Sequence, residues 1–201
     1  MNHAPFRRTC VLPLIAALAL VLGACSKPET PAASLSASTV AAPALSYDKI
    51  VAEGKGFTAG ALMSANTVYV LFDPQCPHCG HLWQASQSLL NKAKFVWIPV
   101  SIINAKSAVQ GATLLSAANP AELMSAHETS LLAGTGGLPG TETPSAELQA
   151  AIKGNTQLFN DLALESVPFA VAKNARTGQV VTHSGAMDAA TLAQWLGIDG
   201  L

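Results

Sequence analysis

The sequence predicts an α/β domain built from a strand–helix–strand unit, a helical insertion and a final strand–strand–helix segment. Three observations predict this order. Two runs of β-branched and aromatic residues, at 67–72 and 94–101, enclose a segment in which apolar residues recur at helical spacing. Residues 105–164 are rich in Ala, Leu, Glu and Gln, which favour helix. Residues 169–182 hold two short apolar runs around a turn, and a last helical pattern follows at 188–196.

The first half has the pattern of a parallel βαβ unit. Residues 67–72 read TVYVLF, without the alternation of a half-exposed strand, so we expect a strand buried on both faces. Pro77 opens the helical segment, where the first turn tolerates proline. Residues 94–101, KFVWIPVS, form the second predicted strand. One helix between two strands implies parallel pairing and a right-handed crossover.

The second half begins with three predicted helices. They cover residues 105–118, 120–133 and 145–164. The loop 134–140, GTGGLPG, separates the second from the third, and Gly154 with Asn155 is expected to split the third.

A hairpin and a helix are predicted to end the domain. Strands are expected at 169–172 and 179–182, because residues 174–178 between them have the chemistry of a hairpin turn. The last helix is expected from Asp188, as N-cap, to Leu196.

The N-terminal segment has the pattern of an export signal. Two arginines precede an uncharged apolar run, Thr9–Ala24, that is short for a membrane span. The run leads into Leu22-Gly23-Ala24-Cys25, which resembles the lipobox of bacterial lipoproteins. The resemblance implies that a lipoprotein signal peptide, residues 1–24, is removed and that Cys25 is lipidated. An ordinary secretory signal is the alternative, and both place the mature protein outside the cytoplasm.

The region after the signal is predicted to be a tether and one domain. Residues 25–46 carry the lipidated cysteine and then a stretch of Ala, Ser, Thr and Pro that cannot bury a core. The domain is expected at 47–201, opening with a short helix at 47–53 before the breaker Gly54-Lys55-Gly56.

Charge and cysteine usage narrow the function. The chain has a formal net charge of -1 and offers no basic cluster, which argues against nucleic acid as a partner. Of its four cysteines, Cys10 is lost with the signal and Cys25 carries the lipid. Only Cys76 and Cys79 remain, so a framework of structural disulfides is excluded.

The tetrad Cys76-Pro77-His78-Cys79 is the predicted reactive centre, because it lies at the junction of a buried strand and a helix. The helix N-terminus favours the Cys76 thiolate, and an imidazolium at His78 would add to this effect. We therefore expect the pKa of Cys76 to fall below the free value of about 8.5. Cys76 is the predicted nucleophile, and Cys79, one turn further in, is the predicted resolving thiol.

Other roles for the cysteine pair fit less well. Zinc needs four ligands, whereas the remaining histidines, His81, His127 and His183, are scattered, and the last two are expected on the surface. Haem attachment needs His after the second cysteine, where Gly80 stands. A structural staple across so small a loop would remove little entropy from the unfolded chain.

Residues 70–83, VLFDPQCPHCGHLW, resemble the catalytic domain of periplasmic disulfide isomerases of the Dsb family, the DsbG and DsbC type. The resemblance extends loosely over most of residues 47–201 and implies a thioredoxin-like fold. In such proteins a cis-proline lies beside the redox pair, and the matching residue is Pro168. The backbone of Val167 is then implied to pair with an extended substrate segment.

Two features depart from the isomerase pattern. A short tether stands where the isomerases have an N-terminal dimerisation domain, so we expect a monomer. The Pro-His pair inside the tetrad and the valine before Pro168 resemble the DsbA oxidases. This resemblance implies a strong oxidant, with a Cys76 pKa well below 7. The direction of electron flow therefore stays open.

We expect a thiol:disulfide oxidoreductase, an isomerase or reductase or an oxidase, acting on exported proteins with cysteines. Its only expected redox group is the Cys76–Cys79 disulfide, with no metal and no other cofactor, and a membrane partner must reset it. The expected location is the periplasm, anchored by lipid to the inner or the outer membrane. A copper chaperone or delivery factor using His78, His81 and Met63 is the alternative, and reduction of sulfenic acids is a third possibility.

Overall fold

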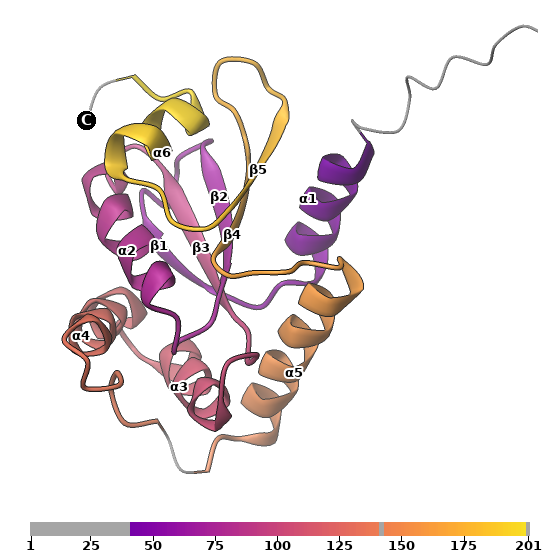
Figure 1. Cartoon of the computed structure of the whole chain (residues 1–201). Helices are drawn as coiled ribbons and strands as arrows, with labels where there is room; N and C mark the ends of the chain where they lie inside the picture. The colour runs from indigo at the N-terminus through magenta and orange to yellow at the C-terminus, as the bar shows by residue number, and fades with distance from the viewer. Residues whose placement is uncertain (1–40, 141–142, 200–201) are drawn as a thin grey trace, which may run out of the picture. The chain divides into compact units, whose positions relative to one another are not determined.

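The computed structural model describes residues 41–140 and 143–199. The predicted signal peptide, Cys25 and the first part of the predicted tether lie outside the described residues. The described part folds into a five-stranded mixed sheet with helices on both faces, in the strand order β1-β3-β2-β4-β5 (Figure 1). The predicted α/β class is confirmed. Across these residues, no helix has both the length and the apolar character needed to cross a membrane.

The centre of the sheet is the predicted βαβ unit. β2 (Thr67–Phe72) and β3 (Lys94–Pro99) pair in parallel, and α2 (Pro77–Ser86) with the 3₁₀ turn η1 (Gln87–Leu89) connects them. Both strands end in three consecutive buried residues, because helices cover the sheet on both sides. The absence of alternation in the sequence therefore predicted these strands correctly.

The C-terminal strands and helix also follow the prediction. β4 (Phe169–Lys173) pairs antiparallel with β2, and β5 (Val180–Ser184) pairs antiparallel with β4. α6 (Ala189–Leu196) begins after Asp188, whose side chain accepts the backbone N–H of Thr191 at 2.7 Å.

One edge strand was not predicted. β1 (Phe57–Gly60) pairs antiparallel with β3 at the edge of the sheet. Its four residues, FTAG, are too few and too weakly β-forming to stand out in the sequence. Gly60 has a positive φ of 93°, and a Cβ there would lie 2.5 Å from the carbonyl oxygen of Ala93, so the turn out of β1 requires glycine.

The first helix is longer than predicted. α1 (Ala41–Glu53) begins within the expected tether, so residues 41–46 are helical and that part of the tether prediction is wrong. Pro43 falls in the first turn, where a backbone N–H has no helical partner to lose. α1 lies beside α5, where Lys49 forms an ion pair with Asp161 at 3.1 Å.

The predicted helical insertion lies between β3 and β4. It consists of α3 (Ala105–Ser116), α4 (Pro120–Leu132) and α5 (Ala146–Asp161). Each begins after a polar N-cap side chain, Asn104, Asn119 or Ser145, that accepts a backbone N–H. α5 runs unbroken through Gly154 and Asn155, so the predicted split is wrong.

Asn155 explains why α5 stays intact, because its side chain is buried and hydrogen-bonds to two other segments of the chain. Its Oδ1 accepts the N–H of Lys55 at 2.8 Å, and its Nδ2 donates to the carbonyls of Lys55 at 2.7 Å and Pro99 at 2.9 Å. Exposed asparagines favour turns, but this buried one connects α5 to the segment before β1 and to the end of β3.

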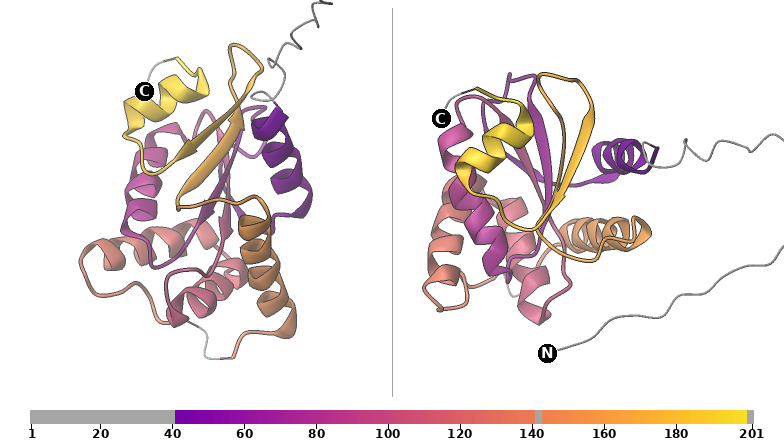
Figure 2. Two further views of the ribbon diagram at one scale, coloured as in Figure 1. Left: turned by 45° about the vertical axis from the view of Figure 1, so that its right-hand side comes forward. Right: turned by 45° about the horizontal axis from the view of Figure 1, so that its top comes forward.

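The helices divide the core in two. α2, α4 and α6 cover one face of the sheet and α1 and α5 the other (Figure 2). The first face buries Val68, Val70 and Phe72 of β2 with the two cysteines, and the second buries Leu71 with residues of α1 and α5. The two cysteines therefore lie on the face of the sheet that α2, α4 and α6 cover.

Replacing Asn155 with alanine should leave the N–H and carbonyl of Lys55 and the carbonyl of Pro99 without their side-chain partner. We expect Asn155→Ala to lower the free energy of unfolding by about 2–3 kcal/mol, because an unpartnered buried polar group such as the Pro99 carbonyl costs about 1–3 kcal/mol and the part-buried Lys55 groups add less. Urea unfolding followed by circular dichroism measures the loss. Asn160→Ala, at an exposed position of the same helix, is the matched control. Equal stability of the two variants would contradict the role assigned to Asn155.

Candidate redox site

The loop from β2 into α2 is shaped by the carboxylate of Asp73. This side chain is fully buried and accepts three backbone N–H groups, from Gln75 at 2.8 Å, Ile102 at 2.7 Å and Ile103 at 3.0 Å. The backbone carbonyl oxygen of Asp73 accepts the N–H of Cys76 at 2.9 Å. The end of β2, the segment after β3 and the first cysteine are thus fixed together.

Cys76 is the N-cap residue of α2, with extended backbone angles (φ -98°, ψ 109°) and Pro77 at the first helical position. Its Sγ accepts the N–H of Cys79 at 3.4 Å. Cys76 is 4% exposed and Cys79 is 0% exposed, and both are free thiols. The predicted strand-to-helix junction and the deeper position of the second cysteine are confirmed.

The environment makes the two thiols unequal. The pKa of Cys76 is lowered from 9.0 to about 7, first by a hydrogen bond from the Cys79 side chain and then by the N–H groups of Cys79 and His78. Burial and the negative charge of Asp73 oppose this lowering, so the expectation of a pKa well below 7 is wrong. Burial raises the pKa of Cys79 well above 9.0. Cys76 is therefore the thiol that ionises near neutral pH.

Val167 and Pro168 lie beside the first sulfur, as the resemblance implies. The peptide between them is cis. The Cys76 thiol donates to the carbonyl oxygen of Val167 at 3.5 Å. Pro168 leads directly into β4, whose Phe169 pairs with Leu71 of β2, so the sheet itself holds this segment next to the cysteine.

The other residues predicted around the cysteines are less closely assembled. His78 acts on Cys76 through its backbone N–H, while its ring is exposed and lies 6.4 Å from the ring of His81, centroid to centroid. Met63 is 97% exposed and precedes β2, whereas the cysteines follow it, so the two lie beyond opposite ends of that strand. Within residues 41–140 and 143–199, no group of three or more His, Cys, Asp or Glu residues could hold a metal ion.

His127 corrects another expectation, because it is 1% exposed and not on the surface. Its Nε2 lies 2.7 Å from the carbonyl oxygen of Pro74, and its Nδ1 accepts the N–H of Leu138 at 3.2 Å. Since Nδ1 accepts, Nε2 carries the proton and donates to Pro74. Burial lowers the pKa of His127, which favours this neutral form. His183 lies half-buried on β5, opposite Ala170.

A glutamine network adds a second link between the insertion and the cysteine loop. Gln75 donates to Gln110 Oε1 at 2.6 Å and to the carbonyl of Gly136 at 2.9 Å. Gln110 in turn donates to the carbonyl oxygens of Gly136 at 3.0 Å and Leu138 at 2.7 Å. The residue just before Cys76 is therefore held by α3 and by the loop after α4.

Glu128, which follows His127 on α4, was not predicted as part of the site. It is 1% exposed, and neither of its carboxyl oxygens has a hydrogen-bond partner among the described residues. Burial, and secondly the charge of Cys76, raise its pKa from 4.5 to about 9. The helical spacing of Met124, Glu128 and Leu131 would have placed it on the buried face of α4.

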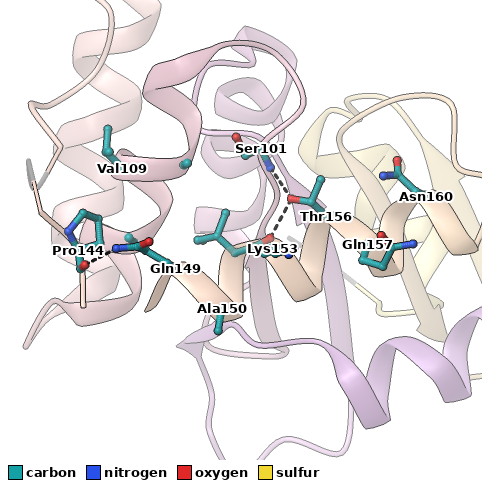
Figure 3. A pocket seen from close by; sticks show the side chains of 12 residues that line it. Ser101, Val109, Pro144, Gln149, Ala150, Lys153, Thr156, Gln157 and Asn160 are labelled. Carbon is teal, nitrogen blue, oxygen red and sulfur yellow. Dashed lines mark hydrogen bonds between the residues drawn. The ribbon is translucent and has the colours of Figure 1, made fainter. Parts of the chain in front are cut away.

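An open pocket of about 610 Å³ lies apart from the cysteines, between α3 and α5 (Figure 3). The residues that line it include Ala108, Val109, Gln149, Ile152 and Lys153. The Oγ1 of Thr156, which also lines the pocket, accepts the N–H of Ser101 at 3.0 Å. None of the predicted site residues lines this pocket.

The chain resembles known proteins in sequence and in structure, although no family model matches it. It is 28% identical over 144 residues to the thiol:disulfide interchange protein DsbG of Pseudomonas aeruginosa, a match that covers 69% of this chain and 54% of that protein. The chain thus spans about half the length of this relative.

Two solved structures show the same fold. The catalytic domain of Proteus mirabilis ScsC superposes with a TM-score of 0.61 at 15% identity, covering 78% of this chain and 96% of that domain. The thiol-disulfide exchange protein alpha-DsbA2 from Wolbachia pipientis gives 0.59 at 17% identity, covering 80% and 98%.

The fold and the buried Cys-x-x-Cys pair define a thioredoxin-like protein, as the sequence predicted. Within that class, the chain is similar in sequence to DsbG and shares its fold with ScsC and alpha-DsbA2.

The ionisation of Cys76 should control its reactivity. Because its pKa is lowered from 9.0 to about 7, we expect the rate of alkylation by iodoacetamide to rise with pH through a midpoint near pH 7 and to level off about one pH unit higher. Samples quenched at successive times and analysed by mass spectrometry give this profile for the reduced protein. Cys79→Ala removes the largest cause of the lowering, so its midpoint should move towards 9.0. A wild-type midpoint already near 9.0 would contradict the assignment.

Glu128 should make stability depend on pH. Its folded pKa is raised, so the folded protein keeps a proton that the unfolded chain releases above pH 4.5, and stability is lost as pH rises towards 9. Between pH 4 and pH 7, Glu128→Gln should therefore gain about 3 kcal/mol relative to wild type, at about 1.4 kcal/mol per pH unit. Urea unfolding at both pH values measures this change. The exposed Glu122→Gln is the control, and a gain equal to that of the control would refute the assignment.

Proposed function

We propose that this chain is a thiol:disulfide oxidoreductase that exchanges disulfides with exported proteins containing cysteines. The observation that carries the proposal is the inequality of the two thiols. Cys76 has a pKa of about 7 at the start of a helix, while Cys79 is buried with a raised pKa. One thiol that ionises near neutral pH beside one that stays protonated suits a nucleophile and a resolving group.

The proposed exchange has two steps. In the reducing direction, the Cys76 thiolate attacks a substrate disulfide, a Cys76–substrate bond forms, and the other substrate sulfur leaves with the electron pair. Cys79 then loses its proton and attacks Sγ of Cys76, which forms the protein disulfide and releases the substrate as a dithiol. The oxidising direction is the reverse of both steps.

Val167 and Pro168 are the proposed substrate-binding residues. The carbonyl of Val167 faces the Cys76 sulfur at 3.5 Å, so an extended segment paired with this backbone would bring its own sulfur to Cys76. Ile102 and Ile103, 40% and 47% exposed, follow β3 and share the Asp73 carboxylate with the cysteine loop. They offer apolar contacts to such a segment.

The pKa of Cys76 supports an isomerase or reductase more than a strong oxidant. Burial and the charge of Asp73 oppose the lowering of the Cys76 pKa to about 7, whereas the oxidase DsbA stabilises its thiolate far more strongly. A less stabilised thiolate gives a less oxidising disulfide. We therefore propose that the isomerase-like surroundings, and not the Pro-His pair within the tetrad, decide the direction of exchange.

The proposed site of action is the periplasm, with Cys25 as a lipid anchor and the segment after it as a tether. A membrane partner would reset the redox pair of a monomeric domain. The sequence of residues 1–46 supports the anchor and the export. The alternative of a copper chaperone or delivery factor would use the same two thiols, and no group of three or more His, Cys, Asp or Glu residues joins them among the described residues.

Trapping of the mixed disulfide tests the proposed function. We expect the wild type to catalyse reshuffling of a scrambled disulfide protein in the presence of a thiol. Cys79→Ala should accumulate a covalent complex through Cys76, because the resolving thiol is gone, and Cys76→Ala should form none. Non-reducing electrophoresis and mass spectrometry read out the complex. Catalysis by wild type no faster than the uncatalysed reaction would overturn the proposal.

A further inference from the structure

A cavity beside the redox loop has no part in the proposed exchange. It has a volume of about 410 Å³ and lies between α3 and the glycine-rich loop 134–140. Its lining includes Lys106, Val109, Gln110, Gly136 and Gly137. The side chain of Gln75, the residue before Cys76, donates to both Gln110 and Gly136. The cavity therefore adjoins the loop that carries the nucleophile.

The cavity is within reach of a polypeptide bound at Cys76. Gln75 adjoins Cys76, and its Nε2 lies 2.9 Å from the carbonyl oxygen of Gly136. One step along the backbone, of about 3.8 Å, one glutamine side chain and one hydrogen bond therefore separate the cysteine from the cavity lining. An extended segment spans that separation in about two to four residues, at about 3.3 Å per residue.

The glycine-rich wall of the cavity is held in place by α4. Gly136 and Gly137 have positive φ angles of 86° and 79°, and a Cβ on Gly137 would collide with the buried ring of His127. The Nδ1 of that ring accepts the N–H of Leu138 at 3.2 Å. The loop is thus fixed by packing and by a hydrogen bond, so the cavity is formed before a ligand binds, as ligand sites usually are.

Lys106 gives the cavity a positive charge. Its side chain is exposed and forms no ion pair among the described residues. A Cβ placed on Gly136 would lie 3.6 Å from its Nζ, so the ammonium lies over the glycine-rich loop. The side chain of Asn104 joins this part of α3 to the redox loop, because it accepts the N–H of Lys106 at 2.9 Å and donates to Gln75 at 3.2 Å.

The charge of Lys106 is available to a ligand. Within residues 41–140 and 143–199, no acidic side chain lines the cavity. Of the two buried acids near the thiols, Asp73 already accepts three backbone N–H groups, and burial raises the pKa of Glu128 to about 9. The N–H groups of Gly136 and Gly137 have no acceptor among the described residues. A carboxylate fits this lining, since its oxygens accept from an ammonium and from backbone N–H groups at once.

We infer that this cavity binds the carboxylate of an Asp or Glu side chain in the substrate, about two to four residues from the substrate cysteine that pairs with Cys76. The inference rests on the proposed function and names a substrate class for it, exported proteins with an acidic residue close to the reacting cysteine. Lys106 is then a specificity-determining residue, and the glycine-rich loop of the insertion is part of the substrate site.

Paired peptides test the inference on the full-length oxidised protein. Both peptides have blocked ends and one reduced cysteine, and they differ by Glu or Gln three positions away. The rate at which each opens the Cys76–Cys79 disulfide is divided by its rate with hydroxyethyl disulfide, which corrects for the reactivity of its thiol. At low ionic strength we expect wild type to prefer the Glu peptide by about two- to fivefold, the range of one exposed ion pair.

Variants of Lys106 assign that preference to the cavity. Lys106→Gln should bring the ratio of the two corrected rates to about one, and Lys106→Glu should reverse the preference, because the charge is lost or inverted. Lys106→Arg should keep the preference. Lys153→Gln, at another exposed lysine, on α5, is the matched control and should keep the ratio of wild type.

The position of the acid supplies a second readout. In peptides with Glu at successive distances from the cysteine, the preference should peak at one spacing, because the cavity holds the carboxylate in one place. A preference that is equal at all spacings, or that Lys106→Gln leaves unchanged, would overturn the inference. Equal corrected rates for the Glu and Gln peptides with wild type would also overturn it, while covalent trapping by Cys79→Ala would still stand. If neither peptide opened the disulfide of the wild type, the proposed function would fail instead.

Discussion

The carboxylate of Asp73 is the interaction on which the rest of the site depends. By accepting N–H groups from the segment after β2 and from the segment after β3, it determines where the sheet stops and where the redox helix starts. Cys76 becomes the N-cap only because this turn delivers it there. The same negative charge raises the pKa of the thiol it positions. The site therefore combines accurate placement of the sulfur with moderate stabilisation of its thiolate.

The helical insertion contributes to the site as directly as the sheet does. α4 supplies His127, which holds the carbonyl of Pro74, and α3 supplies Gln110, which holds the side chain of Gln75. The loop before Cys76 is thus clamped between Asp73 on one side and the insertion on the other. A shift of α4 would displace the loop before Cys76 through these hydrogen bonds, so the insertion and the redox centre are structurally coupled.

Local patterns in the sequence predicted the parts of the fold that depend on local chemistry. The unbroken apolar run of β2, the proline at the start of α2 and the spacing of the two cysteines each have a direct physical meaning within a few residues. β1 was not predicted, because it forms by pairing with β3, a partner distant in the chain. The continuity of α5 escaped for the same reason, since Asn155 is kept helical by Lys55 and Pro99. The pKa of Cys76 required knowledge of its burial and of Asp73, which only the packed structure gives.

Gly80 has a consequence for how this sequence can change. A methyl group there would meet the Glu128 carboxyl at 2.6 Å and the Leu132 side chain at 3.2 Å, so the hydrogen of glycine sets the spacing between two helices. Gly80 and Glu128 are far apart in the chain, yet a change at one of them limits which residues fit at the other. Divergent sequences that keep the acid should keep the glycine, and those that lose the glycine should shorten or lose the acid. Covariation of the two positions would thus record the packing of α4 on the redox helix.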